Sequence, residues 1–175
     1  MDSNTIREAY IALGGNIGDA HATLEAAVNE VANHPKILEL SLSRFYITSP
    51  VSSIPQPDFV NAVCLVETTM DLRTLFNFLQ SVEIKFGKTP NIKDAPRPID
   101  LDILFFGHET CDAPDLKIPH PEWKNRLFVL TPLMDLTDKI TVPHGTFPET
   151  FQTINLIEYM QTFTNSHNET LRVLN

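Results

Sequence analysis

The sequence predicts an α+β fold, and two observations carry the prediction. Segments with the alternation of strands and segments with the apolar spacing of helices follow one another as strand, helix, strand, strand, helix and strand. With 175 residues, of which 42% are hydrophobic, the chain can bury a sizeable core as one domain. This βαββαβ order is that of the ferredoxin-like folds, in which two helices cover one face of an antiparallel sheet.

The first half of the pattern is bounded by turn and capping residues. Residues 10–13 (YIAL) read as an apolar strand, which the turn at residues 14–16 (GGN) ends. Asp19 can cap the helix that follows, and Pro35 stops it. Alternation of leucine with polar residues then predicts a second strand over residues 38–46.

The second half repeats this arrangement. An apolar run predicts a third strand over residues 59–67. Asp71 can cap a second helix, and Gly87 is its natural C-terminal stop. A loop that contains proline and lysine, residues 88–98, leads into the fourth strand at residues 99–106 (IDLDILFF).

The rest of the chain is expected to cover the free face of the sheet and so to complete a three-layer α/β/α arrangement. Residues 120–135 read as a short helical segment, and residues 148–163 read as a further helix. The polar stretch 164–175 is expected to be loosely held.

Composition argues against some classes of partner. The formal net charge of −9 argues against nucleic-acid binding, which needs a basic surface. No apolar run has the roughly 18 residues of a membrane span, and the first residues lack a signal-peptide pattern. We therefore expect a cytoplasmic protein with no membrane partner. Cys64 and Cys111 are expected to be free thiols.

Two carboxylates interrupt the apolar fourth strand. Because strand side chains alternate, Asp100 and Asp102 share one face, while Leu101 and Ile103 point into the core beneath the helices. Two strand residues span about 6.5 Å, so the carboxylates can hold one or two Mg²⁺ ions, whose charge would relieve their repulsion. The alternative is a salt-bridged pair with a nearby arginine as its partner.

Basic residues surround this strand in the sequence. Seven of the 13 lysines and arginines fall in residues 85–126, and His120, between two prolines, precedes Arg126 by six residues. Such cations beside a metal-carboxylate pair suit a polyphosphate, although they also fit an ordinary solvated surface. The residues favour a Mg²⁺-dependent enzyme that acts on a nucleoside triphosphate. No phosphate-binding loop of the GxxxxGK[ST] or GxGxxG type occurs, so side chains and metal would have to hold the phosphates.

Residues 93–104 (KDAPRPIDLDIL) resemble the signature of the hydroxymethyl-dihydropterin pyrophosphokinases of the folate pathway. Further segments agree with that family in order and spacing: 10–16 (YIALGGN), 45–50 (FYITSP), 56–62 (QPDFVNA), 118–121 (IPHP) and 125–128 (NRLF). The resemblance covers about residues 9–145. It implies one pyrophosphokinase domain over residues 1–175, with a core at about 9–145 and a C-terminal helix and tail at 146–175.

The resemblance also implies the reaction. The family transfers a pyrophosphoryl group from ATP, its co-substrate, to the hydroxymethyl group of 6-hydroxymethyl-7,8-dihydropterin, and it releases AMP. Asp100 and Asp102 would bind two Mg²⁺ ions, and the substrate hydroxyl would attack the β-phosphorus. The implied catalytic residues are Arg97, Asp100, Asp102, His120 and Arg126.

Two sets of binding residues are implied as well. The ATP-binding positions are Gln80, Glu83, Lys88, Lys93, Arg97, Ile103, Lys117, His120 and Arg126. The pterin-binding positions are Thr48, Val51, Phe59, Asn61 and Phe128. The pterin would stack between the two phenylalanines, and Asn61 would bind its amide edge. Without the family, Phe59 and Phe128 would be interpreted as core residues, and Glu83 as the partner of a lysine on a helix surface.

Two positions depart from the family pattern. Pro90 stands where a second basic residue is common, and Asp94 stands where many members have tryptophan. The resemblance implies that both lie in a loop that closes over substrates, so a homologue that binds pterin or nucleotide without transfer is an alternative. A different D-x-D nucleotidyltransferase, which would release pyrophosphate, leaves Phe59, Asn61 and Phe128 unexplained. The expected partners are the two small-molecule substrates only, and the chain is expected to be a monomer.

Overall fold

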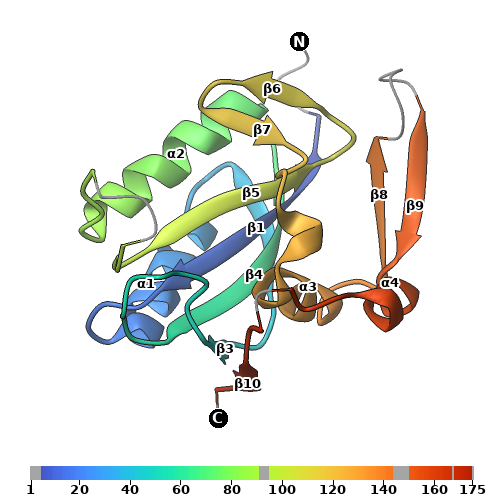
Figure 1. The fold of residues 1–175 in the computed structure, drawn as a ribbon. Coiled ribbons are helices and arrows are strands. Elements are labelled where there is room, and N and C mark those ends of the chain that lie inside the picture. The colour runs from blue at the N-terminus through green and yellow to red at the C-terminus, as the bar shows by residue number, and fades with distance from the viewer. Residues whose placement is uncertain (1–4, 91–94, 144–149, 167, 175) are drawn as a thin grey trace.

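The computed structural model describes residues 5–90, 95–143, 150–166 and 168–174, and it shows a mixed α/β fold built on an antiparallel sheet (Figure 1). The strands in these residues are β1 (Arg7–Gly15), β2 (Ile37–Leu42), β3 (Tyr46–Thr48), β4 (Phe59–Thr68), β5 (Asp100–Phe106), β6 (Cys111–Ala113), β7 (Leu116–Ile118), β8 (Lys139–Pro143), β9 (Phe151–Asn155) and β10 (Leu171–Val173). The helices are α1 (Ala20–Ala32), α2 (Leu72–Lys85), α3 (Leu127–Met134) and α4 (Leu156–Thr162), with a 3₁₀ turn at Trp123–Asn125. None of the helices in the described part of the chain combines the length and apolar character that a membrane span requires.

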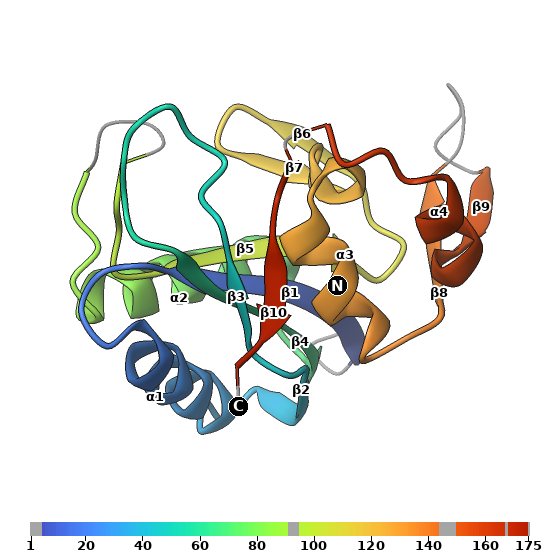
Figure 2. The ribbon, with the colours of Figure 1, turned by 60° about the horizontal axis from the view of Figure 1, so that its bottom comes forward.

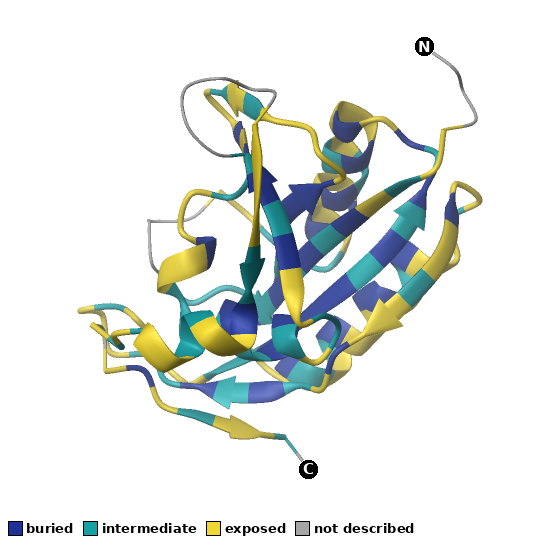
Figure 3. Cartoon of the chain, turned by 90° about the vertical axis from the view of Figure 1, so that its right-hand side faces the viewer, coloured by how far each residue is buried: buried dark blue, intermediate teal, exposed yellow. Residues whose placement is uncertain are grey.

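The main sheet has six strands in the order β10-β3-β4-β1-β5, with β2 also paired to β4. Every pairing in this sheet is antiparallel. Helices α1 and α2 pack on one face, and α3 and α4 belong to a second apolar cluster on the other (Figures 1 and 2). Buried positions concentrate in the central strands between the two clusters (Figure 3). The arrangement agrees with the α+β prediction.

The capping predictions for the two long helices are confirmed. The Asp19 carboxylate accepts a hydrogen bond from the backbone N–H of Ala22 (3.0 Å), and Asp71 accepts one from Thr74 (2.8 Å). These bonds satisfy backbone donors that the first helical turn leaves without partners. Gly87 follows the end of α2 with a φ of 94°, which a residue without a side chain adopts at little cost.

Strand β5 has the two-faced character that its alternation predicts. Leu101 and Ile103 are buried in the cluster beneath α1 and α2, so Asp100 and Asp102 face the other side. The alternation then breaks at Leu104, which is an extra residue because Tyr10 pairs with Phe105 while the next residue of β1 pairs with Ile103. The bulge leaves the Leu104 carbonyl to accept a hydrogen bond from the backbone N–H of His120 (2.9 Å).

Two expectations about the C-terminal part were wrong. Residues 148–163 were expected to form one helix, but the described part is strand β9 followed by the short helix α4, while residues 148 and 149 lie outside the described residues. Pairing with β8, which places Ile154 opposite Ile140, overrides the helical spacing, and Asn155 caps α4 by accepting a bond from the N–H of Glu158 (3.1 Å).

The tail was expected to be loosely held, yet its end forms β10 and completes the sheet beside β3. The strand predicted over residues 38–46 is divided into β2 and the start of β3, because residues 43–45 leave the ladder between them. The thiols of Cys64 and Cys111 form no disulfide, as predicted.

The end of β1 lies unusually close to its neighbours. A side-chain carbon added at Gly15 would clash with the backbone carbonyl of Pro98, and one added at Gly14 would come 2.6 Å from the side-chain oxygen of Asn61. Backbone cannot move aside as a side chain can. The absence of a side chain at Gly15 is therefore required for β1 to meet the start of β5.

We expect Gly15→Ala to lower the free energy of unfolding by about 1–3 kcal/mol, the usual cost of forcing an extra carbon into a packed site. Urea denaturation would measure it. The control Ser41→Ala adds nothing to a crowded site, because Ser41 is exposed on β2, and it should stay within about 0.5 kcal/mol of the unsubstituted protein. Equal stability of the two variants would contradict the close approach.

Candidate active site

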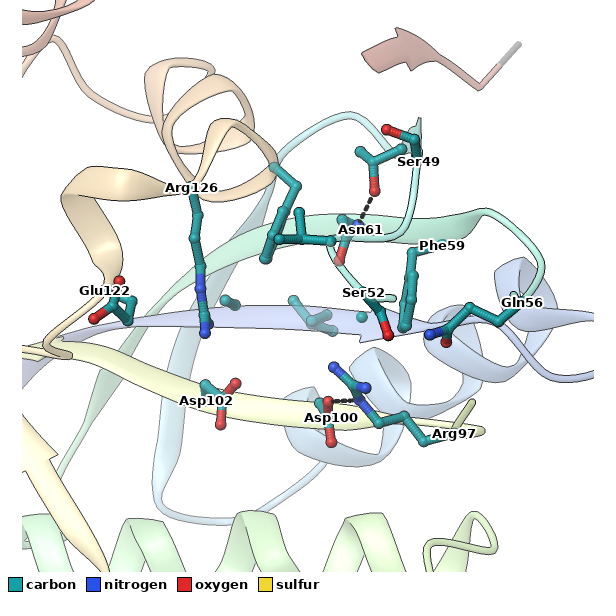
Figure 4. Close-up of a pocket in the computed structure, with 16 residues that line it drawn as sticks. Ser49, Ser52, Gln56, Phe59, Asn61, Arg97, Asp100, Asp102, Glu122 and Arg126 are labelled. Atoms are coloured by element: carbon teal, nitrogen blue, oxygen red, sulfur yellow. Dashed lines mark hydrogen bonds and ion pairs between the residues drawn. The ribbon is translucent and has the colours of Figure 1, made fainter. Parts of the chain in front are cut away.

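A cavity of about 390 Å³ opens beside the ends of β1 and β5, on the face of the sheet that carries the two aspartates (Figure 4). It gathers residues from five separate parts of the chain. The predicted site residues that line it are Thr48, Val51, Phe59, Asn61, Arg97, Asp100, Asp102, Arg126 and Phe128. The fold therefore brings the aromatic and amide positions into one space with the carboxylate pair and two arginines.

Asp100 is held by two cations. The Arg97 guanidinium donates to its Oδ2, and the Nζ of Lys88 lies 2.8 Å from its Oδ1. Lys88 also reaches Glu83 (2.8 Å), whose carboxylate accepts a hydrogen bond from the backbone N–H of Leu101 (2.6 Å). This chain of contacts fastens helix α2 to the start of β5 and places Lys88 beside the carboxylate pair.

The network changes the pKa values of its buried members. Burial raises the pKa of Glu83, although its hydrogen bonds with Lys88 and the Leu101 N–H pull in the opposite direction. Burial lowers the pKa of Lys88, but its hydrogen bonds to Asp100 and Glu83 outweigh this effect, so its pKa is raised. Lys88 is therefore a firmly charged cation beside Asp100.

Asp102 lies in a different environment. It faces the cavity and stays accessible through it, yet protein surrounds the carboxylate closely enough to raise its pKa, and the charge of Asp100 raises it further. Arg126 extends from the start of α3 toward Asp102, and its charge acts in the opposite direction (Figure 4). The two carboxylates thus differ: Asp100 is paired with cations, and Asp102 carries a charge that its surroundings do not fully compensate.

His120 is fixed next to this pair by its backbone and its ring. Its N–H is bound by the Leu104 carbonyl, and its ring Nδ1 accepts a hydrogen bond from the N–H of Glu122 (3.2 Å). The remaining ring nitrogen, Nε2, must then carry the proton of the neutral ring. Burial lowers the pKa of His120, and Arg126 lowers it further, while Asp102 opposes this effect. At neutral pH the ring is an uncharged hydrogen-bond donor.

On the aromatic side of the cavity, each phenylalanine ring has an arginine next to it. The guanidinium of Arg97 lies 4.9 Å from the centre of the Phe59 ring, and that of Arg126 lies 5.5 Å from the centre of the Phe128 ring. Asn61 is buried and donates through its amide nitrogen to the Thr48 hydroxyl (2.6 Å). Because that bond fixes the amide, the Asn61 oxygen is the side-chain acceptor that can be presented to a ligand.

Comparison with known proteins identifies the family. The family model described as 7,8-dihydro-6-hydroxymethylpterin-pyrophosphokinase (HPPK) matches residues 10–138. The chain belongs to this family. This confirms the resemblance seen in the sequence.

Three relatives illustrate the similarity. The 2-amino-4-hydroxy-6-hydroxymethyldihydropteridine pyrophosphokinase of Pseudomonas aeruginosa is 36% identical over 140 residues, which are 80% of this chain and 86% of that protein. The protein of the same name from Bacillus subtilis is 36% identical over 132 residues, 75% of this chain and 79% of the relative. The bifunctional protein FolKE of Lactococcus lactis subsp. cremoris is 37% identical over 131 residues, 75% of this chain but only 38% of that longer protein.

Some positions implied by the HPPK resemblance lie away from the cavity. Gln80 is exposed on α2, and the side chain of Ile103 is buried in the core beneath α1 and α2. Lys117 is exposed on β7 and forms an ion pair with Asp112. Glu83 is buried and bound to Lys88, so it differs from the helix-surface ion pair that was its alternative interpretation. Lys93, like Asp94, lies outside the described residues.

Asn16 binds two residues that line the cavity, Arg97 and Gln56, and sequence reasoning gave it no such role. Its backbone N–H donates to the Arg97 carbonyl (3.0 Å), and its side-chain oxygen accepts from the Arg97 N–H (3.0 Å). Its amide nitrogen donates to Gln56 Oε1 (2.9 Å) and to the Pro57 carbonyl (3.0 Å). Asn16 thus joins the segments that lead into β4 and β5. Its place in the GGN turn was the available signal.

Besides Ala12, Leu13 and Gly14 of β1, four lining residues with polar side chains were missed: Ser49, Ser52, Gln56 and Glu122. Each lies within four residues of a predicted site residue. Proximity in sequence was therefore a signal, but side-chain type alone does not distinguish a serine that lines a cavity from one in an ordinary loop.

The raised pKa of Asp102 has a consequence for stability. The folded protein favours the protonated form of the Asp102 carboxyl. Its contribution to the free energy of unfolding is therefore complete below the pKa of an aspartate in the unfolded chain, about 3.9, and is lost as pH rises through the higher pKa of the folded state. Without divalent cations, we therefore expect Asp102→Asn to be more stable than the unsubstituted protein at pH 7. The difference should shrink as the pH falls toward 4. Urea unfolding at several pH values measures it.

Asp115→Asn is the matched control. The hydrogen bond with Arg73 lowers the pKa of this exposed carboxyl, so its substitution should slightly lower stability at pH 7, and the loss should fade with acidification. If Asp102→Asn instead lowered stability at neutral pH, the carboxylate would be better compensated in the folded protein than its surroundings indicate.

Proposed function

We propose that this chain transfers the pyrophosphoryl group of ATP to the hydroxymethyl group of 6-hydroxymethyl-7,8-dihydropterin, giving the pterin diphosphate and AMP. The chain's HPPK membership supports this reaction. The observation that supports this site for the reaction is that Phe59, Asn61 and Phe128 line the same cavity as the aspartate pair. The two substrates can therefore meet there.

The pterin would lie between Phe59 and Phe128, where a flat, polar ring can stack on both faces. The Asn61 side-chain oxygen would accept a hydrogen bond from the pterin amide edge, because Thr48 holds the Asn61 amide in place. Val51, which is exposed at the cavity, would form part of the entrance. The guanidinium groups of Arg97 and Arg126 lie over the Phe59 and Phe128 rings. In the complex they would lie at the hydroxymethyl end of the pterin, close to the phosphates.

Asp100 and Asp102 would hold two Mg²⁺ ions. No group of three or more metal-ligating side chains occurs among the described residues, which suits Mg²⁺, because this ion commonly takes one or two carboxylates and fills its other positions with water and phosphate oxygens. The uncompensated charge of Asp102 supports the fit. When bound, the ions would neutralise the triphosphate and align it with the attacking hydroxyl.

The chain's own cations would hold the nucleotide. Arg97 and Arg126 would bind phosphate oxygens in a fork, and Lys88 would add a point charge beside Asp100. The Nε2–H of neutral His120 would donate to a phosphate oxygen without adding charge. The pterin hydroxyl oxygen would form a bond to the β-phosphorus and lose its proton to water, the bond from that phosphorus to the α,β-bridging oxygen would break, and AMP would leave with that oxygen.

The remaining nucleotide positions are proposed with smaller roles. Glu83 would act through Lys88, which it holds, and Ile103 would reach the nucleotide only with its backbone. Gln80 and Lys117 would contact the nucleotide only after a change at the rim of the site. Lys93 is proposed to add a positive charge for the nucleotide.

We further propose a single ferredoxin-like domain over residues 1–175, and the order β3-β4-β1-β5 with helices α1 and α2 on one face supports it. The chain is proposed to act as a monomer. The free thiols Cys64 and Cys111 support a cytoplasmic location.

The nucleotide product tests the proposed function. Purified protein mixed with ATP, Mg²⁺ and the reduced hydroxymethyl pterin should form AMP only when pterin is present, without free pyrophosphate. Asp102→Ala should lower the rate at least about 1,000-fold, because the ions would lose one of two carboxylate ligands, while circular dichroism shows an unchanged fold. Separation of AMP, ADP and pyrophosphate by chromatography measures the outcome.

Three results would count against this proposal. Free pyrophosphate would indicate a nucleotidyltransferase. Binding of both ligands without AMP would indicate a homologue that does not transfer. Full turnover by Asp102→Ala would remove Asp102 from the reaction.

A further inference from the structure

We infer that the C-terminal segment, residues 164–166 and 168–174, positions the walls of the pterin pocket, and that Glu169 is the positioning residue that fixes Phe128. This inference rests on the proposed function for the identity of the ligand. The segment lies wholly beyond residues 10–138, the part of the chain that the family model matches.

The segment first supports the wall of the pocket that β3 forms. Strand β10 lies along β3 at the edge of the sheet, with Leu171 paired to Thr48 (Figure 2). Ser49 donates its backbone N–H to the Thr170 carbonyl (3.0 Å), and its hydroxyl accepts the Thr170 N–H (2.8 Å). Thr48 and Ser49 both line the cavity, and Thr48 holds Asn61. The tail therefore sits directly behind the amide-binding side.

The same segment supports the opposite wall through Glu169. This side chain is buried, with 5% of its surface exposed, and its Oε2 accepts a hydrogen bond from the backbone N–H of Phe128 (3.3 Å). Phe128 is the second residue of α3, whose first backbone donors have no partner within the helix. Helices usually satisfy these donors with the side chain of the capping residue, but Arg126 occupies that position and makes no side-chain cap.

Glu169 thus caps α3 from 41 residues along the chain. A carboxylate is also favoured at a helix N-terminus by the helix dipole. The Arg126 side chain has no acceptor with which to cap these donors, and it extends into the cavity, where its guanidinium lies over the Phe128 ring. The position of the Phe128 backbone, from which one stacking ring extends, therefore depends on a residue of the tail.

A local clasp holds Glu169 in place. The Asn165 side-chain oxygen accepts the Glu169 N–H (2.9 Å), and the Asn165 amide donates to the Glu169 carbonyl (2.8 Å). With the backbone fixed on one side by Asn165 and on the other by pairing with β3, the carboxylate has little freedom to follow a displaced α3. The segment sets the distance between the two pocket walls.

The test compares Glu169→Ala with Glu169→Gln and with the neighbouring control Thr170→Ala. Glu169→Ala removes the acceptor, whereas Glu169→Gln keeps an oxygen in the same place. The Thr170 contacts run through its backbone, so its substitution leaves them intact. Titration calorimetry with the reduced hydroxymethyl pterin, and separately with a non-hydrolysable ATP analogue plus Mg²⁺, measures the dissociation constants.

We expect Glu169→Ala to weaken pterin binding about tenfold and nucleotide binding less than about threefold. Glu169→Gln should recover most of the pterin affinity, and Thr170→Ala should match the unsubstituted protein. Unchanged pterin affinity in Glu169→Ala, or an equal loss for both ligands, would overturn the inference. If Glu169→Ala does not fold, Glu169→Asp withdraws the carboxylate by one methylene and should show the same selective loss.

A measurement without ligand separates this inference from the proposed function. Amide hydrogen exchange at Phe128 should be faster in Glu169→Ala than in Thr170→Ala, while amides of β1 and β4 stay protected. Unchanged exchange at Phe128 would show that Glu169 does not hold this backbone. If the unsubstituted protein bound no pterin, the proposed function would fail, and the exchange result alone would decide whether Glu169 positions Phe128.

Discussion

The candidate site depends on how closely three segments meet where β1 ends. Gly15 has no side chain, so the Pro98 carbonyl can lie against its backbone, and Asn16 can then bind the backbone of Arg97 from both sides. The same asparagine holds the segment before β4 through Gln56. Backbone contacts of this kind have few alternative arrangements. The position of Arg97 relative to Phe59, and thus of the proposed phosphate side relative to the proposed pterin side, follows from packing at a turn rather than from the site residues themselves.

Charge on β5 is distributed unequally, and this inequality gives the aspartate pair its chemical character. Asp100 is compensated by Arg97 and Lys88, while the pKa of Asp102 is raised by burial and by Asp100. A site that keeps one carboxylate paired and the other under-compensated gives up some stability of the ligand-free protein, and a bound cation would restore it. Glu83 belongs to the same balance, because it holds Lys88 near Asp100 without contacting the cavity itself.

The sequence was sufficient for features that depend on near neighbours. Helix caps at Asp19 and Asp71 require a bond only three residues away, and the two faces of β5 follow from alternation. Features that depend on distant partners could not be predicted. The helix expected over residues 148–163 was wrong because β8 supplies a pairing partner for its first part. Nothing near Glu83 in the chain reveals that the Leu101 N–H will meet it, and nothing near Glu169 points to Phe128.

The bulge at Leu104 shows how one extra residue lets a single strand serve both the core and the site. Before it, β5 directs Leu101 and Ile103 into the cluster under α1 and α2. The bulged Leu104 and the next residue, Phe105, both join the second cluster beside α3. The carbonyl that the bulge takes out of the β1 ladder accepts the backbone N–H of His120. The histidine thereby comes close enough to Asp102 for the charge of each to shift the pKa of the other. A regular strand would leave this carbonyl in the ladder, and the loop that carries His120 would lose its anchor beside the carboxylates.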